Sequence, residues 1–254
     1  MFKKVFTCML MVSLIITGTI NITYAQDYEQ ESQVISKDEI NNRLRTFSQE
    51  SKSVDLNEKT IKSLEQRIKR GELLDSEKED SRPISVREYT EDSKLITEER
   101  FDDGSFILTE VTDHDSLMEE YEQFLEKNKS KSNWTSFISN SGTVVSSTSY
   151  HTTINGAKVR KSHGAYWAGF SFDYSTYRKG NSKIHRVYGA QSIAGGGTMS
   201  LSSPRIIQGT ATITSPARAE MDFTFSGYGG VGSYSGVVGI TAGNNNGSGG
   251  IYTY

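Results

Sequence analysis

Cysteine is almost absent from this 254-residue chain, and its single copy, Cys8, lies among the first ten residues. Residues 1–25 are predicted to be a secretory signal peptide, because two lysines precede the apolar run 5–16 and Ala25 ends a small-x-small cleavage site. The mature chain would then lack thiols, which excludes disulfides, thiolate zinc sites and cysteine nucleophiles. We expect a secreted, extracellular protein stabilised by its core alone.

Long apolar runs are also missing. The run 5–16 is shorter than the ~20 residues that a membrane-spanning helix needs, and no other stretch is longer. The alternative is a retained N-terminal anchor, since Ile20 and Ile22 follow closely. We expect release of the mature chain rather than anchoring.

Recognisable catalytic and metal-binding patterns are scarce. His151, His163 and His185 are isolated, so only the fold could assemble a metal site from them. No serine lies in a Gly-x-Ser-x-Gly elbow before a predicted helix, and the glycines at 195–197 are not followed by the Gly-Lys-Ser/Thr of a phosphate loop. We therefore predict no catalytic residue, no metal and no cofactor.

One carboxylate pair is a weak candidate for acid–base chemistry. Glu220 and Asp222 project from the same face of a predicted strand, and glycosidases use such pairs. That face is the polar one of a regular alternation, however, so we expect both carboxylates to be solvated.

Charge and glycine divide the chain in two. Residues 26–140 carry 28 acidic against 17 basic side chains (−11), whereas residues 141–254 carry 3 against 9 (+6) and hold 20 of the 23 glycines. We predict an acidic α+β region over 26–127, a linker over 128–133 and a Gly/Ser/Tyr-rich domain over 134–254.

The acidic region reads as two helices, a β-hairpin and a third helix. Ser36 and Glu39 form a capping box before the first helix, the second is expected from Asp55 to Gly71, and the third spans 115–127. Between them, 75–82 is expected to be a charged linker, and 86–91, 94–101 and 105–112 are expected strands.

Alternating residues dominate the last 120 positions. Over 166–174 the even positions are apolar or aromatic, with Trp167, Gly169, Ser171 and Asp173 between them, which predicts a half-buried strand. Further strands are expected at 143–152, 157–161, 184–193, 198–201, 205–214, 217–226, 228–241 and 251–254, with a turn at Asn155-Gly156. The fold class predicted is mainly β, an antiparallel β-sandwich of about seven or eight strands preceded by a small α+β region.

Four short motifs lie at residues 69–76, 100–105, 157–162 and 215–219. They resemble a family of secreted proteins of Gram-positive bacteria with a C-terminal β-rich domain of unknown function. The resemblance implies an extracellular location and supplies no catalytic residues.

Cations and aromatic rings are interleaved between 158 and 186. Charge there would steer an anionic polymer and rings would stack on its apolar faces, so we predict a ligand-binding surface for a wall polymer or lipid head groups. Its predicted residues are Lys158, Arg160, Lys161, Trp167, Tyr177, Arg178, Lys179, Lys183 and Arg186, with Tyr188 nearby. The alternative is a solvated strand edge where lysines prevent aggregation. Nucleic acid is not an expected partner of an exported protein with an acidic first half.

We therefore predict a non-catalytic cell-surface or extracellular binding module. A toxin-like, membrane-active protein is one alternative, because the Ser/Thr/Gly-rich strands 143–152 and 228–241 resemble amphipathic hairpins, although they lack sustained lipid-facing alternation. A wall-degrading hydrolase is a second alternative without a supporting motif. The charge division also predicts that the acidic region docks on the basic domain and masks it.

Overall fold

A computed structural model describes residues 35–128, 137–139, 142–148, 150–177, 181–227, 233–243 and 251–254. The predicted signal peptide, positions 129–133 of the predicted linker, and Arg178 and Lys179 lie outside the described residues. Every helix in the described part is too short or too polar to cross a membrane.

Two helices and two short 3-10 turns open the described chain: α1 (Lys37–Glu50), η1 (Ser51–Ser53), α2 (Glu58–Lys69) and η2 (Asp75–Glu77). The predicted capping box is confirmed, since Glu39 N donates to Ser36 Oγ (3.2 Å) and Ser36 N donates to Glu39 Oε2 (2.9 Å). These bonds satisfy backbone N–H groups that the first turn leaves free.

The start of α2 differs from the prediction. Its N-cap is Asn57, whose Oδ1 accepts from Thr60 N at 2.9 Å, rather than Asp55. Asn and Asp cap equally well, so local preference did not distinguish the two positions. The predicted end at Gly71 is confirmed, because this glycine has φ +75° and its N–H donates to Ile68 O at 2.9 Å.

The first sheet has eight antiparallel strands, and it includes strands from both sides of the predicted linker. They are β1 (Ser85–Glu91), β2 (Lys94–Arg100), β3 (Phe106–Thr112), β4 (Phe137–Ser139), β5 (Gly142–Ser147), β6 (His151–Ser162), β7 (Trp167–Tyr177) and β8 (Lys183–Ile193), with α3 (His114–Lys127) between β3 and β4. Along one edge β6 pairs first with β5 and then with β3, and its other edge pairs with β7.

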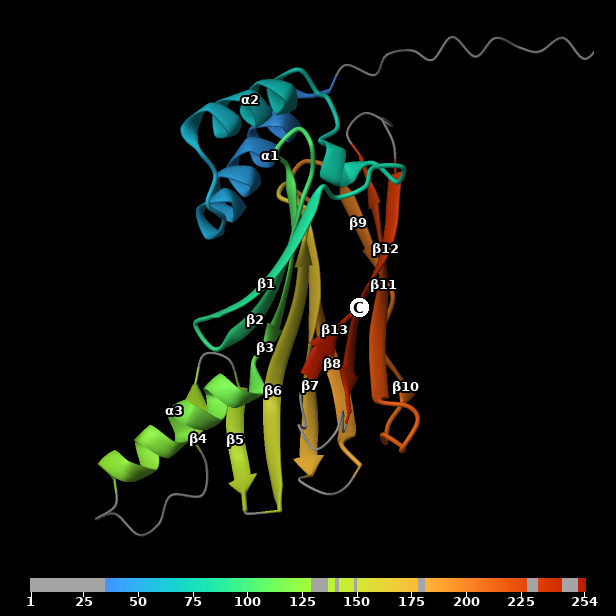
Figure 1. Cartoon of the computed structure of the whole chain (residues 1–254). Helices are drawn as coiled ribbons and strands as arrows, with labels where there is room; N and C mark the ends of the chain where they lie inside the picture. Colours follow the sequence, from blue (N-terminus) through green and yellow to red (C-terminus); the bar gives the residue numbers. More distant parts are fainter. Residues whose placement is uncertain are drawn as a thin grey trace, which may run out of the picture. The chain divides into compact units, whose positions relative to one another are not determined.

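The second sheet faces the first and has five antiparallel strands. They are β9 (Thr198–Leu201), β10 (Arg205–Gln208), β11 (Ala217–Ser226), β12 (Ser233–Ala242) and β13 (Ile251–Thr253). The predicted mainly β, sandwich-like fold is therefore confirmed (Figure 1). Among the described residues, ten strands follow residue 134 rather than seven or eight, partly because the expected strand 143–152 is two strands.

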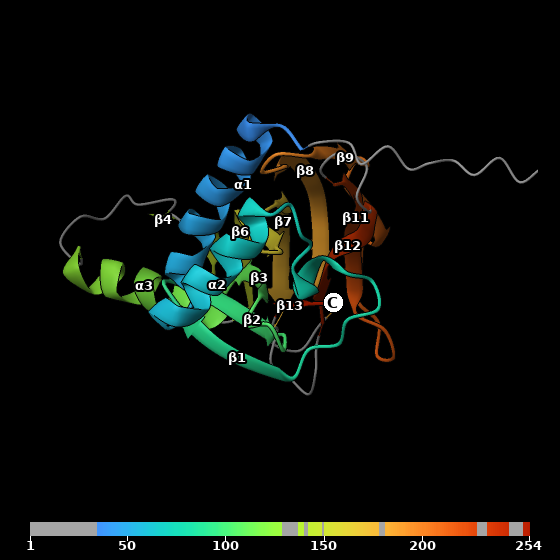
Figure 2. The same ribbon diagram turned by 90° about the horizontal axis from the view of Figure 1, so that it is seen from above.

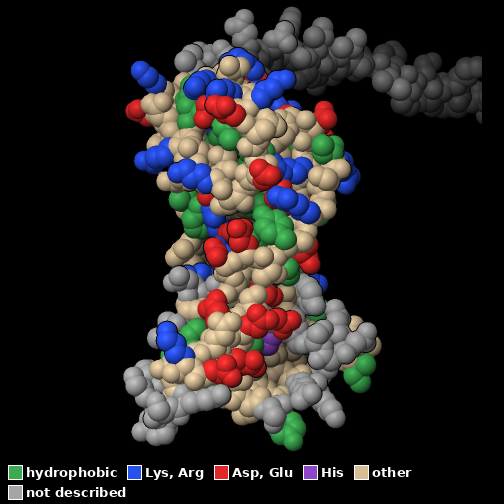
Figure 3. All heavy atoms as spheres, turned by 60° about the vertical axis from the view of Figure 1, so that its left-hand side comes forward, with side chains coloured by type: hydrophobic (Ala, Val, Ile, Leu, Met, Phe, Trp, Pro, Cys, Tyr) green, Lys and Arg blue, Asp and Glu red, His purple; other side chains and the backbone are tan. Residues whose placement is uncertain are grey.

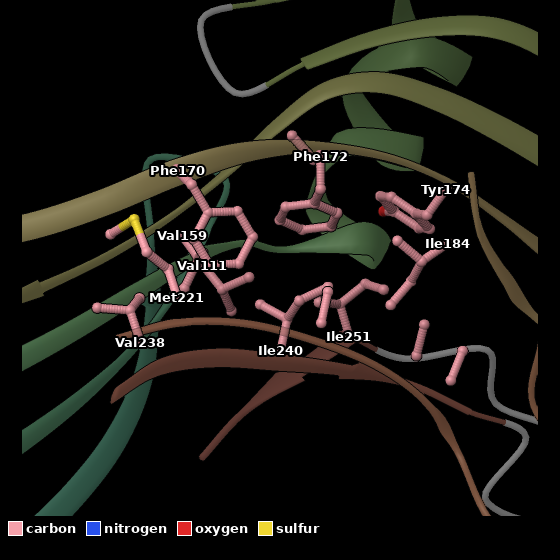
Figure 4. Packing of buried hydrophobic residues seen from close by; sticks show 14 of the residues in the cluster. Val111, Val159, Phe170, Phe172, Tyr174, Ile184, Met221, Val238, Ile240 and Ile251 are labelled. Atoms are coloured by element: carbon pink, nitrogen blue, oxygen red, sulfur yellow. The ribbon is translucent and has the colours of Figure 1, made fainter. Parts of the chain in front are cut away.

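Aromatic side chains fill the space between the sheets. Phe170, Phe172 and Tyr174 point from β7 towards Met221 and Ile240 of the second sheet (Figure 4). Burying each such side chain contributes about 1.5–3 kcal/mol of transfer free energy. The predicted inward positions of β7 are thus confirmed.

A second apolar cluster lies on the opposite face of the first sheet. Phe47, Leu64 and Ile68 from α1 and α2 pack there with Phe106 and Leu108 of β3. Figure 2 shows α1 and α2 on the side of β6 and β7 that faces away from β11 and β12. Both faces of β3 are therefore covered, which explains its nearly continuous apolar run.

Two expectations for the middle of the chain are wrong. The expected strand 143–152 is divided into β5, which ends at Ser147, and β6, which begins at His151, and Thr148 N donates to His151 O between them. Asn155-Gly156 is not a hairpin turn but lies inside β6, where Gly156 has φ +72° and the pairing with β7 shifts between Ile154 and Ala157. A positive φ at one glycine produces a bulge as readily as a turn.

The segment 75–82, expected to be only a charged linker, contains a buried anchor. Glu77 and Arg43 form an ion pair in which each side chain is 1% exposed. Arg43 also donates to Glu72 O at 2.7 Å, and Leu74 N donates to Glu77 Oε2 at 2.7 Å. The ion pair therefore connects α1 to η2. Each of the two charges is tolerated in the interior because the other one compensates it.

Candidate functional site

The outward side of β6, β7 and β8 brings together several of the predicted ligand-binding residues. We call this surface the β6–β8 face; it consists of Lys158, Arg160, Trp167, Ser171, Asp173, Arg186 and Tyr188. Residues opposite each other on paired strands share a face, and the register aligns Lys158, Ser171 and Tyr188 in one row. Lys158 and Tyr188 are then about 10 Å apart, with a small serine between them.

Two arginines on this face stack on aromatic rings. The Arg160 guanidinium lies 4.6 Å from the centroid of the Trp167 ring, and the Arg186 guanidinium lies 4.4 Å from that of Tyr188. Such contacts hold the rings and the charges together in one orientation. Burial and the hydrogen bond to Asp173 raise the pKa of Tyr188.

Carboxylates already neutralise both arginines. Arg160 pairs with Glu50 of α1 and, at 3.3 Å, with Glu110 of β3. Arg186 pairs with Asp173 at 2.8 Å, and the Tyr188 hydroxyl donates to the same carboxylate at 2.9 Å. Lys158 is exposed, and no ion-pair partner for it is found within the described ranges. The free positive charge of the face is thus smaller than the sequence suggests.

A pocket of about 600 Å³ adjoins this face. It is lined by Asp92, Lys94, Glu110, Val111, Thr112, Glu120, Lys158 and Arg160. Lys94 contacts Glu110 at 3.4 Å, so much of the charge in the pocket is internally paired. Lys158 and Arg160 contribute to both the pocket and the β6–β8 face.

The other predicted binding residues lie elsewhere or outside the described part. Lys161 projects from the opposite side of β6 to Arg160, and burial lowers the pKa of its ammonium group. Tyr177 stacks on His151 with ring centroids 5.8 Å apart near the end of β7, and Lys183 is exposed opposite Ser175. Arg178 and Lys179 are not among the described residues.

The histidines do not converge on one centre. In the described part of the chain, no group of three His, Cys, Asp or Glu side chains is arranged to hold a metal ion. His163 is fully buried and donates from Nδ1 to Ser76 O at 2.9 Å. Its ring packs on Tyr166 and Tyr234, at centroid distances of 4.8 and 4.6 Å.

His185 contacts a serine, but the arrangement differs from that of a nucleophile. Ser175 Oγ lies 2.7 Å from His185 Nε2 and 2.8 Å from Thr153 Oγ1, and Ser175 is only 2% exposed. A substrate carbonyl needs direct access to the attacking oxygen. This chain of hydroxyls and imidazole instead connects β6, β7 and β8.

Glu220 and Asp222 are bridged by a single arginine. Arg205 of β10 donates to Glu220 Oε1 at 2.6 Å and also pairs with Asp222. The hydrogen bond from Arg205 lowers the pKa of Asp222. A carboxyl held in its ionised form is a poor general acid. Of the two carboxylates expected to be solvated, Asp222 keeps 49% of its side chain exposed, whereas Glu220 keeps only 14%.

Acidic side chains are also concentrated elsewhere. Figure 3 shows them in the lower half of one side, at the level where Figure 1 places α3.

The sequence reasoning missed Glu50 and Glu110 as partners of Arg160, since neither is near it in sequence. For Asp173, the alternation of β7 already placed it on the same face as Trp167.

Comparisons with protein-family models, with curated proteins and with solved structures gave no match to this chain.

Proposed function

We propose that this protein is a secreted, non-catalytic module that binds an anionic, sugar-containing polymer of a Gram-positive cell surface through its β6–β8 face. The observation that carries the proposal is the pair of arginine–aromatic stacks on adjacent strands, with Lys158 and Ser171 between them. Rings offer apolar area to sugar faces, and cations bind the acidic groups of the same polymer.

The geometry also supports a modest affinity. Arg186 keeps 64% of its side chain exposed beside Asp173, so a phosphate or carboxylate ligand would share it with that aspartate. Lys158 offers a charge without such competition. Because exposed charges are screened by salt, we expect binding to weaken markedly above the ionic strength of about 0.15 M.

The test is a pull-down of the mature chain on purified Gram-positive cell walls, before and after chemical removal of the anionic wall polymer. The double variant Arg186→Ala/Tyr188→Ala should reduce binding at least tenfold. Its matched control is Arg218→Ala/Tyr254→Ala, which removes an equivalent stack (4.8 Å) from the second sheet.

Three results would contradict the proposal. They are no retention of the wild type on intact walls, equal retention on stripped walls, and an equal loss in the control variant. Release of soluble wall fragments by the wild type would instead support a hydrolase.

A further inference from the structure

Two hairpin-like turns at one end of the sandwich are closed in the same way. In the first, Thr148 N donates to His151 O at 2.8 Å, and His151 N donates to Thr148 Oγ1 at 3.1 Å. In the second, Thr212 N donates to Ser215 O at 2.7 Å, and Ser215 N donates to Thr212 Oγ1 at 3.0 Å. Each turn is therefore fixed by a threonine hydroxyl as well as by the backbone.

Each turn holds one large side chain in solvent. Tyr150 is 76% exposed, and Ile213 is 101% exposed. Gln208 Nε2 further fixes the second turn, by donating to Thr210 O at 3.0 Å and to Ser215 O at 3.4 Å. Single exposed apolar residues are ordinary. Folding does not explain why Tyr150 and Ile213 are both exposed beside turns with the same hydrogen bonds, because neither side chain contributes to the core.

The strand register places both turns at the same end of the strands. Thr153 pairs with Ser175, Ser175 pairs with Lys183, and Lys183 forms a bridge with Thr210. This row crosses from β6 to the segment after β10, and Tyr150 and Ile213 both lie beyond it. In Figure 1 the turn after β5 and the loop after β10 are both at the lower end. The row spans three strand intervals, about 15 Å.

Within the two turns and the row between them, the charges favour a lipid surface over a basic protein, whereas the acidic side chains at this end of the molecule belong to α3. The described residues 148, 150–153, 181–185 and 208–215 include no Asp or Glu, although the chain as a whole is acidic. Lys183 is exposed in the middle of the row. Ile207, 49% exposed, lies on β10, the strand that precedes the second turn.

We propose that Tyr150 and Ile213 insert into the interfacial layer of a lipid bilayer, with Lys183 at the level of the head groups. A tyrosine suits that layer, because its ring is apolar and its hydroxyl remains hydrated. An isoleucine gains by leaving water. Because Thr148 and Thr212 are already hydrogen-bonded to His151 and Ser215, insertion costs these residues little conformational entropy. This docking is peripheral, involves no spanning segment and is independent of polymer binding by the β6–β8 face.

The test is co-sedimentation of the full mature chain with phosphatidylcholine vesicles and with 3:1 phosphatidylcholine–phosphatidylglycerol vesicles. Ile213→Ser should lower the partition coefficient about tenfold, and Tyr150→Ser/Ile213→Ser should lower it further. The matched control is Ile84→Ser/Val86→Ser, which removes two exposed apolar side chains (67% and 61%) near β1. It should leave partitioning unchanged.

Several outcomes would overturn the proposal. The first is a wild type that pellets with neither vesicle, and the second is a control that loses as much partitioning as Ile213→Ser. Analytical ultracentrifugation provides a third. If the wild type is a dimer that Ile213→Ser dissociates, a second copy of the chain rather than a lipid surface covers Ile213. Wall pull-down of Ile213→Ser should match wild type, so failure here is distinct from failure of the proposed polymer binding.

Discussion

The hydroxyl of Ser162, at the end of β6, donates a buried hydrogen bond of 2.7 Å to Glu50, the last residue of α1. The same carboxylate pairs with Arg160. One acidic side chain thus joins the helical region to the sandwich, across more than a hundred residues of sequence. Hydrogen bonds to a buried charge are among the stronger polar contacts in a protein.

Replacing Glu50 tests the strength of this connection. Glu50→Ala should lower the free energy of unfolding by about 1–3 kcal/mol, because Ser162 and Arg160 both lose a partner in a largely buried place. Glu50→Gln should cost less, since it keeps an acceptor for Ser162. Urea unfolding at pH 7 measures both. The control is Glu58→Ala, whose exposed pair with Lys62 should matter by less than about 0.5 kcal/mol.

The same substitution tests masking of the basic surface by the acidic region. Glu50→Ala releases Arg160 from one of its two carboxylates, so retention on cell walls should rise if Arg160 binds polymer. Retention unchanged or lowered, in a variant that remains folded by circular dichroism, would argue against masking.

The buried pair of Arg43 and Glu77 should behave as a coupled unit. Arg43→Met and Glu77→Leu should each cost about 3–5 kcal/mol, because each leaves a buried polar group without its main partner. The double variant Arg43→Met/Glu77→Leu should cost clearly less than the sum of the two single changes. A double-mutant cycle by urea unfolding measures the coupling, and additive losses would contradict it.

Stability should fall as the pH is lowered, with a contribution from His163. Burial lowers the pKa of His163 from 6.5 to about 3 in the folded protein, so only the unfolded chain takes up a proton between these values. This contribution is fully present above pH 6.5 and is lost towards pH 3, at about 1.4 kcal/mol per pH unit.

Urea unfolding at pH 7.5, 6.0 and 5.0 measures this slope. His163→Gln keeps a donor for Ser76 O and should make the dependence of stability on pH less steep. A slope in His163→Gln as steep as in the wild type would exclude His163 as its source.

Gly169 should resist substitution, because there is no room for a side chain. A Cβ at this position would lie 2.5 Å from Val159 O of the paired strand. Gly169→Ala should therefore lower the free energy of unfolding by more than about 2 kcal/mol. At Gly209 the nearest atom to a Cβ would be 3.6 Å away, so Gly209→Ala should change stability by less than about 0.5 kcal/mol. Thermal unfolding of both variants provides the comparison.

Local patterns predicted most elements of this fold. The hairpin and third helix are confirmed within one or two residues, because an Asp-Gly turn and a helical period are short-range signals. The prediction of a single strand over 143–152 was wrong, because the polar Ser/Thr run carries no local signal for the turn that the Thr148 hydroxyl stabilises. The predicted start of α2 was wrong because two good capping residues, Asp55 and Asn57, lie two positions apart.

The candidate site was only partly accessible from the sequence. Alternation along β7 already separates outward Trp167 and Asp173 from the buried aromatics. Cross-strand register was not accessible, since bulges in β6 and β8 shift the pairing by one residue. The row of Lys158, Ser171 and Tyr188 therefore appears only in the structure.

By itself, the sequence determined the class of the fold, the inward and outward faces of its strands, and the division of charge between its halves. These follow from composition and from periods of two and about four residues, which act locally. Only the tertiary structure decided that the strands of the acidic region join the same sheet as β6, that Glu50 reaches Arg160, and that Glu77 is buried against Arg43. Such contacts join residues tens of positions apart, and packing of whole elements rather than any local preference selects them.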